Sequence, residues 1–333
     1  MKNKFLIILT AALLAAACGN NTTQQAESAK QTPSVDRAAL KAVAELALGE
    51  SFAEGAQSGR ILVTDVATGN LLLDYGVVRQ GDCLSATVTI DSLIEPASLL
   101  STALVATILD DPAMDLDTST MLRVWSKLYG DKIDIHDSHR IAGSDSLPLH
   151  TAFAEASNVA LCELGEHYYS SSPEEMRSQL LKLFPSAKSD SITNPRDFYR
   201  LCMGYGIRIS PKCLLDFYTA VANGGVNATS GQRVCSTETA ATLKALLREV
   251  VEKGAVKGLA SGDYAIAGKA SLTTSLTMPG RSTAMFVGFF PADSPRYACL
   301  VILELEDVSS SHIRLASSAF HQISDHLMKV ISQ

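Results

Sequence analysis

The sequence has no run of lysines and arginines, no cysteines spaced as metal ligands and no internal repeat. Its 35 acidic residues outnumber its 28 basic ones, which gives a net charge of −7. Because a nucleic-acid-binding surface is basic, this balance argues against DNA or RNA as a partner. The apolar stretch of residues 5–17 is 13 residues long, whereas a membrane-spanning helix needs about 20. A transmembrane anchor is therefore not predicted there.

The first residues are instead typical of an export signal. Lys2 and Lys4 precede the apolar stretch, which ends in Leu-Ala-Ala-Ala-Cys-Gly at residues 14–19. This ending resembles a bacterial lipobox, and the resemblance implies cleavage before Cys18 and acylation of that cysteine. Residues 1–17 are thus predicted to be a signal peptide, and the mature protein is expected to be a lipid-anchored protein of the cell envelope that faces the periplasm. An ordinary secreted protein with a chance cysteine at the cleavage site is the alternative.

The composition changes twice after the signal. Residues 19–33 are rich in Asn, Thr, Gln and Ser and lack apolar periodicity, which is typical of a flexible tether. Apolar residues at helical spacing follow in residues 36–48. We therefore predict a lipid-anchored tether with a leading helix over residues 18–58 and a folded domain over residues 59–333.

Six cysteines remain after Cys18, and an even number in an exported protein permits disulfides. Cys162, Cys202 and Cys299 lie inside apolar runs, where cysteine usually behaves as a small core residue. Most of the thiols are therefore expected to be free and buried.

Strand-like patterns lie at both ends of the predicted domain, and helical patterns lie between them. The strand-like runs are residues 61–66, 71–75, 264–267, 284–290 and 297–305. Residues 98–109 are apolar nearly all round, as in a buried helix, and helical patterns continue to about residue 259 and return over residues 313–330. These observations predict one antiparallel sheet built from both ends of the chain, with the terminal helices on one face and a helical insert on the other. Residues 78–91 give no clear pattern.

Three short segments carry a family resemblance. They read Glu-Pro-Ala-Ser-Leu-Leu-Ser at residues 95–101, Ala-Ser-Asn at 156–158 and Gly-Lys-Ala-Ser at 268–271. In this order they resemble the three motifs of class B, division-type penicillin-binding protein transpeptidases, Ser-x-x-Lys, Ser-x-Asn and Lys-Thr-Gly. Further likeness is carried by residues 137–139, 203–207, 210–211, 222–225 and 286–293.

The resemblance implies both a fold and a chemistry. The fold is the α+β one of penicillin-binding proteins and serine β-lactamases, an antiparallel sheet flanked by helices with an inserted helical subdomain. In the family a serine attacks the substrate after a base has taken its proton. Carried onto this sequence, Ser98 is the candidate nucleophile, Asn158 orients substrate, and Lys269 relays protons and binds the substrate carboxylate. No metal or cofactor is implied.

Four positions depart from the family pattern. Ser101 stands where the family has its lysine base, and Ala156 where it has the relay serine. Ala270 and Ser271 replace the threonine and glycine of the third motif. Losing general-base assistance costs a factor of about 10²–10⁴ in rate, or about 3–5 kcal/mol of barrier. Changes in all three motifs predict a degenerate site.

Three functions follow as hypotheses. The first is a catalytically degenerate, lipid-anchored transpeptidase-like protein that binds peptidoglycan stem peptide or a cell-wall synthesis or division protein. The second is a slow serine acyltransferase, a D,D-transpeptidase, carboxypeptidase or β-lactam hydrolase, in which Ser98 attacks and Lys269 substitutes as base. The third is an envelope-binding module that merely reuses the fold. In the first two, stem peptide or a β-lactam would occupy the cleft.

Each candidate residue also has a purely structural interpretation. Ser98 can cap the buried helix, and Asn158 can bond to the neighbouring backbone. Lys269 can bind carboxylates without catalysing a reaction. Four residues of a polar loop have side chains that can bind a metal ion: Asp134, His136, Asp137 and His139. We do not predict a metal site there.

Overall fold

A computed structural model describes residues 35–81, 83–87, 92–129, 133–138, 143–260, 263–274 and 280–332. The predicted signal peptide, Cys18 and the tether lie outside these residues, as does His139. Within the described ranges, no helix has the length and apolarity needed to span a membrane.

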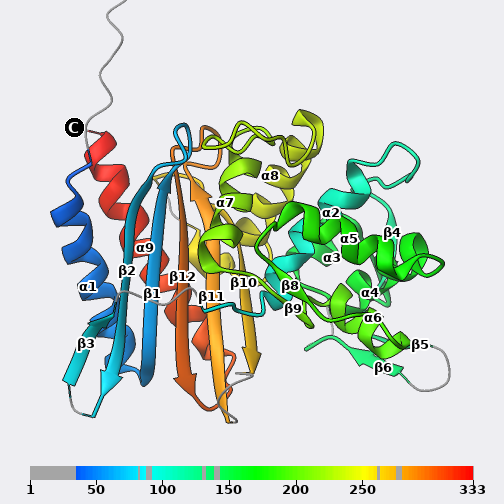
Figure 1. Cartoon of the computed structure of the whole chain (residues 1–333), viewed down its shortest axis with the longest axis horizontal. Coiled ribbons are helices and arrows are strands. Elements are labelled where there is room, and N and C mark those ends of the chain that lie inside the picture. The colour runs from blue at the N-terminus through cyan, green and yellow to red at the C-terminus, as the bar shows by residue number, and fades with distance from the viewer. Residues whose placement is uncertain are drawn as a thin grey trace, which may run out of the picture. The chain divides into compact units, whose positions relative to one another are not determined.

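A six-stranded antiparallel sheet forms the centre of the domain (Figure 1). Its strand order is β10-β11-β12-β1-β2-β3, so strands from the two ends of the chain lie side by side, as the sequence predicts. Residues 78–91, undecided from sequence, contribute the end of β2 and all of β3, and the strand expected at residues 264–267 instead begins at Ala267. The strands are β1 (Ala56–Asp65), β2 (Leu71–Gln80), β3 (Cys83–Thr87), β10 (Ala267–Thr274), β11 (Arg281–Phe290) and β12 (Tyr297–Glu306).

The two terminal helices, α1 (Arg37–Ala53) and α9 (Ser311–Ile331), pack against each other on one face of the sheet. Asp36 caps α1 by accepting hydrogen bonds from the backbone N–H groups of residues 38 and 39. The middle of the predicted apolar stripe of α9, from Ala316 to Leu327, is buried on the sheet, and Phe320 in it lies edge-on to Phe286 of β11, with ring centroids 4.6 Å apart. Burial of this stripe holds the C-terminal helix on the sheet.

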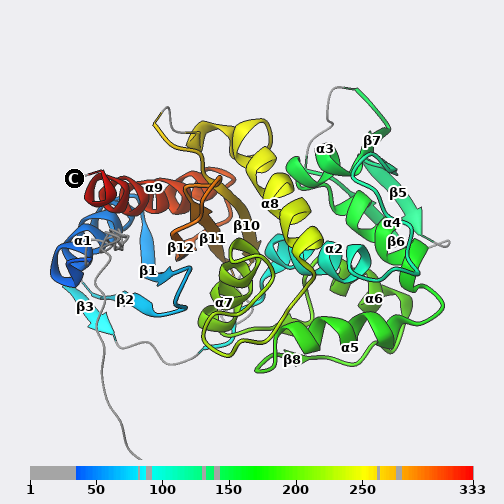
Figure 2. The same ribbon diagram turned by 90° about the horizontal axis from the view of Figure 1, so that it is seen from above.

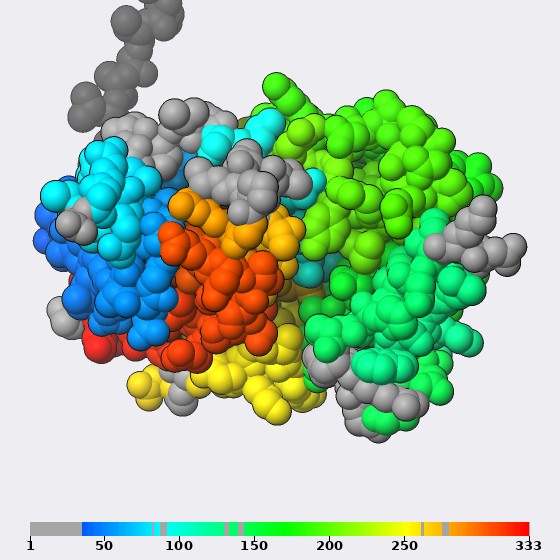
Figure 3. Space-filling model, turned by 90° about the horizontal axis from the view of Figure 1, so that it is seen from below, coloured from blue at the N-terminus to red at the C-terminus, as the bar shows by residue number. Residues whose placement is uncertain are grey.

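The other face is covered by α7 (Pro211–Ala222), which leads into the helical part of the domain (Figure 1). Figure 3 shows the sheet and this helical part meeting along a seam. The remaining helical elements are η1 (Ala97–Leu100), α2 (Ser101–Leu109), α3 (Leu149–Ala154), α4 (Asn158–Tyr169), α5 (Pro173–Leu183), α6 (Pro195–Cys202), α8 (Thr237–Glu252) and η2 (Lys257–Leu259). Short strands complete it: β4 (Met121–Arg123), β5 (Ser126–Tyr129), β6 (Ile133–His136), β7 (Ser146–Pro148), β8 (Lys188–Ser189) and β9 (Ile207–Arg208).

The buried helix predicted over residues 98–109 is two elements, the 3₁₀ turn η1 and the α-helix α2. Ser98 lies inside the turn, and its side chain makes no capping hydrogen bond, so the structural interpretation of Ser98 as a helix cap is wrong. Tyr218 of α7 stabilises the turn, because its hydroxyl donates a hydrogen bond to the Leu99 carbonyl at 2.9 Å. The same hydroxyl lies 2.8 Å from that of Thr102.

The six cysteines after Cys18 are free thiols. Four of them are buried, Cys213 is half-buried and Cys83 is exposed. Desolvation raises the pKa of the Cys235 thiol to about 12, so this buried cysteine stays protonated at neutral pH.

Candidate active site

The turn that carries Ser98 is held by hydrogen bonds with the loop after α6. The Ala97 N–H donates to the Gly204 carbonyl at 3.1 Å, and the Gly206 N–H donates to Glu95 Oε1 at 2.9 Å. Ala97 has a φ of +45°, a left-handed conformation that costs a residue with a Cβ about 1–2 kcal/mol. The strained backbone persists because these contacts on both sides of Ala97 fix it.

No base of the described residues is hydrogen-bonded to the Ser98 side chain. It is half-buried, and among the described residues nothing forms a hydrogen bond with its hydroxyl. At the position where the family has its lysine, the Ser101 hydroxyl donates to the Ser98 carbonyl at 2.7 Å. Ser101 therefore stabilises the backbone of the turn and offers no proton acceptor of suitable basicity to Ser98.

The second motif opens helix α4. Ala156 has a φ of +57° and turns the chain from α3 into α4. Ser157 caps α4 by accepting from the Ala160 N–H at 3.1 Å, and its hydroxyl donates to Asp137 Oδ2 at 2.7 Å. Asn158 is the first residue of the helix, is half-buried, and forms no side-chain hydrogen bond within the described part of the chain. Its amide is therefore not held by the neighbouring backbone, as the structural interpretation required.

The carboxylate of Asp137 holds the second motif in place. Besides Ser157, it accepts hydrogen bonds from the backbone N–H groups of Trp125 at 2.7 Å and Val159 at 3.1 Å. A carboxylate at a helix N-terminus is favoured by the helix dipole. Its neighbours Asp134 and His136 pair with each other at 2.7 Å. The ranges described hold no group of three or more side chains placed to bind a metal ion.

The Lys269 side chain reaches from β10 to the end of α3, where its amine forms a hydrogen bond. The side chain is 1% exposed, and its Nζ donates to the Phe153 carbonyl at 2.8 Å while lying 4.0 Å from the centroid of the Phe153 ring. Desolvation by burial lowers the pKa of the Lys269 amine to about 7. No hydrogen bond joins Nζ to the Ser98 hydroxyl among the described residues. Phe153 was missed from the sequence because nothing in an apolar helical pattern marks one carbonyl as a partner.

The cavity that α3 and α4 form beside Lys269 is almost filled. The cavity there has about 10 Å³ for the centre of a water molecule, enough for about one water and none for a substrate carboxylate. It brings the second and third motifs together, and β10 also packs directly against η1, which carries Ser98. The cavity is lined by Leu149, Ala152, Phe153, Ala156, Ser157, Ala160, Leu161, Leu164 and Lys269.

The two other altered residues of the third motif are also buried. Ala270 is 8% exposed and Ser271 2% exposed. The Ser271 hydroxyl has no hydrogen-bond partner among the residues that the structure describes, and a buried unpaired polar group costs about 1–3 kcal/mol. The serine at this position is therefore a destabilising residue that the fold tolerates.

Ser271→Ala is expected to raise the free energy of unfolding by about 1 kcal/mol, because it removes a buried hydroxyl that has no partner. Ser157→Ala, the same chemical change at another buried serine, is expected to lower it by about 1–3 kcal/mol, because it removes a helix cap and a bond to Asp137. Urea unfolding of both variants and the wild type measures the difference. A loss of stability in Ser271→Ala as large as that in Ser157→Ala would contradict this account.

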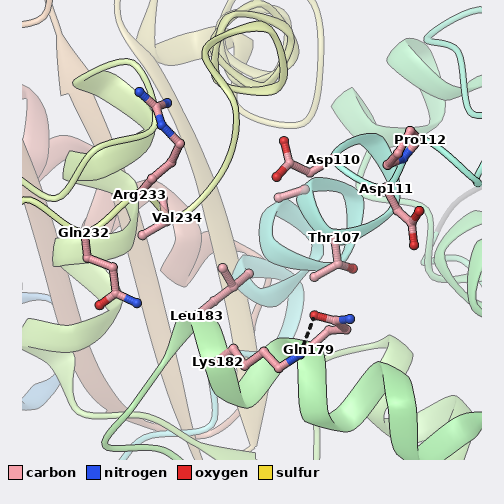
Figure 4. A pocket seen from close by; sticks show the side chains of 11 residues that line it. Thr107, Asp110, Asp111, Pro112, Gln179, Lys182, Leu183, Gln232, Arg233 and Val234 are labelled. Carbon is pink, nitrogen blue, oxygen red and sulfur yellow. Dashed lines mark hydrogen bonds between the residues drawn. The ribbon is translucent and has the colours of Figure 1, made fainter.

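A larger hollow, of about 470 Å³, lies at the far end of α2 (Figure 4). None of its lining residues belongs to the three motifs. Several of its polar groups are already used within the protein: Asp110 accepts from the Ser236 N–H at 2.7 Å, and Lys182 donates to Gln179 at 3.4 Å. We therefore do not assign this hollow to the candidate site.

Comparison with known proteins agrees with this architecture. The family model for the penicillin binding protein transpeptidase domain matches residues 59–325. The chain is 25% identical over 289 residues to the probable peptidoglycan D,D-transpeptidase PenA of Neisseria gonorrhoeae, covering 75% of this chain and 48% of PenA. It is 23% identical over 337 residues to the penicillin-binding protein PbpB of Mycolicibacterium smegmatis, covering 83% and 51%. The chain thus spans about half the length of these curated relatives.

Solved structures show the same fold. The apo transpeptidase domain of Burkholderia pseudomallei penicillin-binding protein 3 superposes with a TM-score of 0.73 at 20% identity, covering 90% of this chain and 96% of that one. The transpeptidase domain of FtsI4 from Legionella pneumophila gives a TM-score of 0.66 at 18% identity, covering 89% and 98%. At these identities the likeness establishes the fold alone.

Proposed function

The chain belongs to the penicillin-binding protein transpeptidase family, and from that premise we propose that it is a member in which acyl transfer has been lost. The proposed role is to bind peptidoglycan stem peptide or a cell-wall synthesis protein at the envelope. The observation that carries the loss of acyl transfer is the bonding of the Lys269 amine, which donates to the Phe153 carbonyl and forms no hydrogen bond with the Ser98 hydroxyl among the described residues.

Two requirements of the reaction, activation of the nucleophile and binding of the substrate carboxylate, support the proposed loss of acyl transfer. A serine hydroxyl needs a positioned base within about 2.6–3.2 Å to become a nucleophile near neutral pH. Ser101 offers none, and Lys269 is enclosed by α3 and α4. The cavity beside the amine also cannot admit the substrate carboxylate that the family resemblance assigns to this lysine.

The purified protein is expected to form no covalent adduct with a fluorescent penicillin, and its intact mass is expected to stay unchanged after prolonged incubation with several β-lactams. The physical reason is the missing base, whose loss alone lowers the rate by a factor of about 10²–10⁴. Ser98→Ala is the matched control, because it removes the only atom that could be acylated in this mechanism. Wild type and variant should give the same background signal.

An adduct in the wild type that disappears in Ser98→Ala would favour the second candidate, a slow serine acyltransferase. One observation supports that candidate: a pKa of about 7 leaves the Lys269 amine neutral in about half of the molecules at pH 7. A neutral amine is a competent base if α3 moves away and releases it. The adduct would then be expected to form faster as the pH rises through 7.

We further propose that residues 1–17 are removed and that lipid on Cys18 holds the domain at the membrane, facing the periplasm. The support is the Leu-Ala-Ala-Ala-Cys-Gly sequence after a basic start. More than one acyl chain is needed for stable anchoring, and a lipidated N-terminal cysteine supplies several. Mass spectrometry of the mature N-terminal peptide tests this, and an unmodified Cys18 would contradict it.

A further inference from the structure

A second hollow lies behind the junction of α3 and α4, on the side of the sheet that carries α9. Its volume is about 810 Å³, within the range of about 300–1,000 Å³ usual for small-molecule sites. One wall is the segment after α8, residues 254–259, and the other is the outward face of α9. Figure 2 shows this segment running alongside α9, and η2 within it packs against that helix. We call this space the α9 hollow.

The floor of the α9 hollow is apolar. Val256 and Leu259 are 7% and 4% exposed, and the half-buried Ile313 of α9 faces the same space. Two exposed hydroxyl groups, those of Ser310 and Ser318, lie along the α9 side. The lining therefore combines a small apolar surface with hydrogen-bonding groups on one wall.

The rim carries two cations without counter-ions. Lys257 and Arg314 are exposed, and neither side chain forms an ion pair within the described part of the chain. The carboxylates of the lining are already engaged. Asp325 accepts from the Tyr264 hydroxyl at 2.6 Å and pairs with His321 at 3.2 Å, and Glu155 also interacts with neighbouring groups. Lys257 and Arg314 are therefore the charged side chains of the lining that have no partner within the described part of the chain, while the carboxylates of Asp325 and Glu155 are engaged but keep their charge.

The hollow is connected to the degenerate site by backbone contacts. The Ala255 N–H donates to the Ala154 carbonyl at 3.0 Å. A Cβ on Gly254 would lie 2.3 Å from that carbonyl oxygen, so the two segments are in close contact. Ala154 directly follows Phe153, whose carbonyl accepts from Lys269. A ligand in the α9 hollow would thus contact the segment that fixes the acceptor of the Lys269 amine.

We propose that the α9 hollow binds a short peptide ending in a free carboxylate and an apolar residue. The terminal carboxylate pairs with Lys257 and Arg314, for which planar bidentate contact with the guanidinium is the favourable geometry. The terminal apolar side chain rests on Val256, Leu259 and Ile313. The peptide backbone finds hydroxyl partners on α9. A long acyl chain fits less well, because three apolar side chains cannot cover it and its carbons would remain in water.

The test is calorimetric titration of the purified protein at low ionic strength with N-acetyl-Leu-Leu, its C-terminal amide and octanoate. N-acetyl-Leu-Leu is expected to bind at least about tenfold more tightly than the amide, because the amide lacks the charge that pairs with the two cations. Octanoate, which has the carboxylate but no peptide groups, is expected to bind more weakly than the peptide. These probes separate a peptide site from a site for any apolar anion.

Arg314→Ala and Lys257→Ala are each expected to weaken N-acetyl-Leu-Leu binding about five- to tenfold, and Arg314→Lys to restore part of the loss. Lys329→Ala is the matched control, because Lys329 is an exposed cation on the same helix that does not line the hollow. Equal affinity for the acid and the amide, equal affinity for octanoate, or no saturable binding up to about 5 mM would each overturn the proposal. Ser98 acylation is measured separately, so failure here leaves the proposed loss of acyl transfer untouched.

Discussion

Gly204→Ala is expected to lower the free energy of unfolding by about 2–5 kcal/mol, one of the largest effects of any single substitution in this domain. Gly204 has a φ of +85°, which costs a residue with a Cβ about 1–2 kcal/mol. Its added Cβ would also lie 2.0 Å from the Ala97 carbonyl oxygen. Hydrogen bonds hold the backbone of both Ala97 and Gly204 in place, so overpacking of about 1–3 kcal/mol adds to the conformational cost.

Gly280→Ala is the matched control for this prediction. Gly280 has the same φ of +85°, but a Cβ built on it meets no atom of the described residues within 4 Å. It should therefore show only the conformational cost of about 1–2 kcal/mol. Urea unfolding followed by circular dichroism gives both values. Equal losses in the two variants would mean that the close approach of Gly204 to the Ser98 turn has no energetic weight.

Lys269→Met is expected to change how the stability of the domain depends on pH. The pKa of the Lys269 amine is about 7 in the folded protein and about 10.5 when the chain is unfolded. Below pH 7 both states hold the proton, and burial of the charge costs the folded state about 5 kcal/mol. Between pH 7 and 10.5 the unfolded state keeps a proton that the folded state has lost, so wild-type stability rises by about 1.4 kcal/mol per pH unit.

The variant has no amine and lacks this rise. Between pH 6 and pH 9 the wild type should therefore gain about 2–3 kcal/mol relative to Lys269→Met, whatever the constant difference caused by the unpaired Phe153 carbonyl. Ionisation of the buried tyrosines and cysteines affects both proteins alike and cancels in the difference. Lys329→Met, at an exposed position of α9, is the control and should run parallel to the wild type. A gap between wild type and Lys269→Met that stays constant from pH 6 to 9 would show that the amine is not buried as described.

Much of the fold could be predicted from the sequence because its patterns are local. The runs at residues 61–66 and 71–75 around a Gly-containing turn identify β1 and β2, and the spaced apolar residues of 313–330 identify α9. Most of β10 lies beyond the strand predicted over residues 264–267, because Lys269, Ser271 and Thr273 interrupt the apolar pattern there, although all three side chains are buried. From sequence alone, a polar residue is expected to be exposed unless the segments that pack over it are known.

The candidate site, like the fold, has features that could be predicted from the sequence and others that depend on the tertiary structure. The resemblance of residues 203–207 to the family can be seen in the sequence. The reason that a glycine is needed at residue 204 is its close approach to Ala97, and these two residues lie more than a hundred positions apart in the chain. In the sequence Asp137 was considered as one of four possible metal ligands. In the structure its carboxylate caps the start of helix α4. Its role depends on the position of α4, which the spacing of Asp134, His136 and Asp137 does not encode.

The sequence by itself determined which chemical groups are available: a hydroxyl at Ser98, no amine at residue 101, and one lysine in the third motif. These are properties of covalent structure, and folding cannot add a base that the chain does not contain. Only the tertiary structure decided where the remaining amine points. Lys269 is 116 residues from Phe153 along the chain, and the packing of both α3 and β10 against α8 brings that carbonyl within hydrogen-bond reach of Nζ, whereas no hydrogen bond joins Nζ to Ser98 among the described residues. The direction of a buried side chain is set by the segments that surround it, and those are known only once the chain has folded.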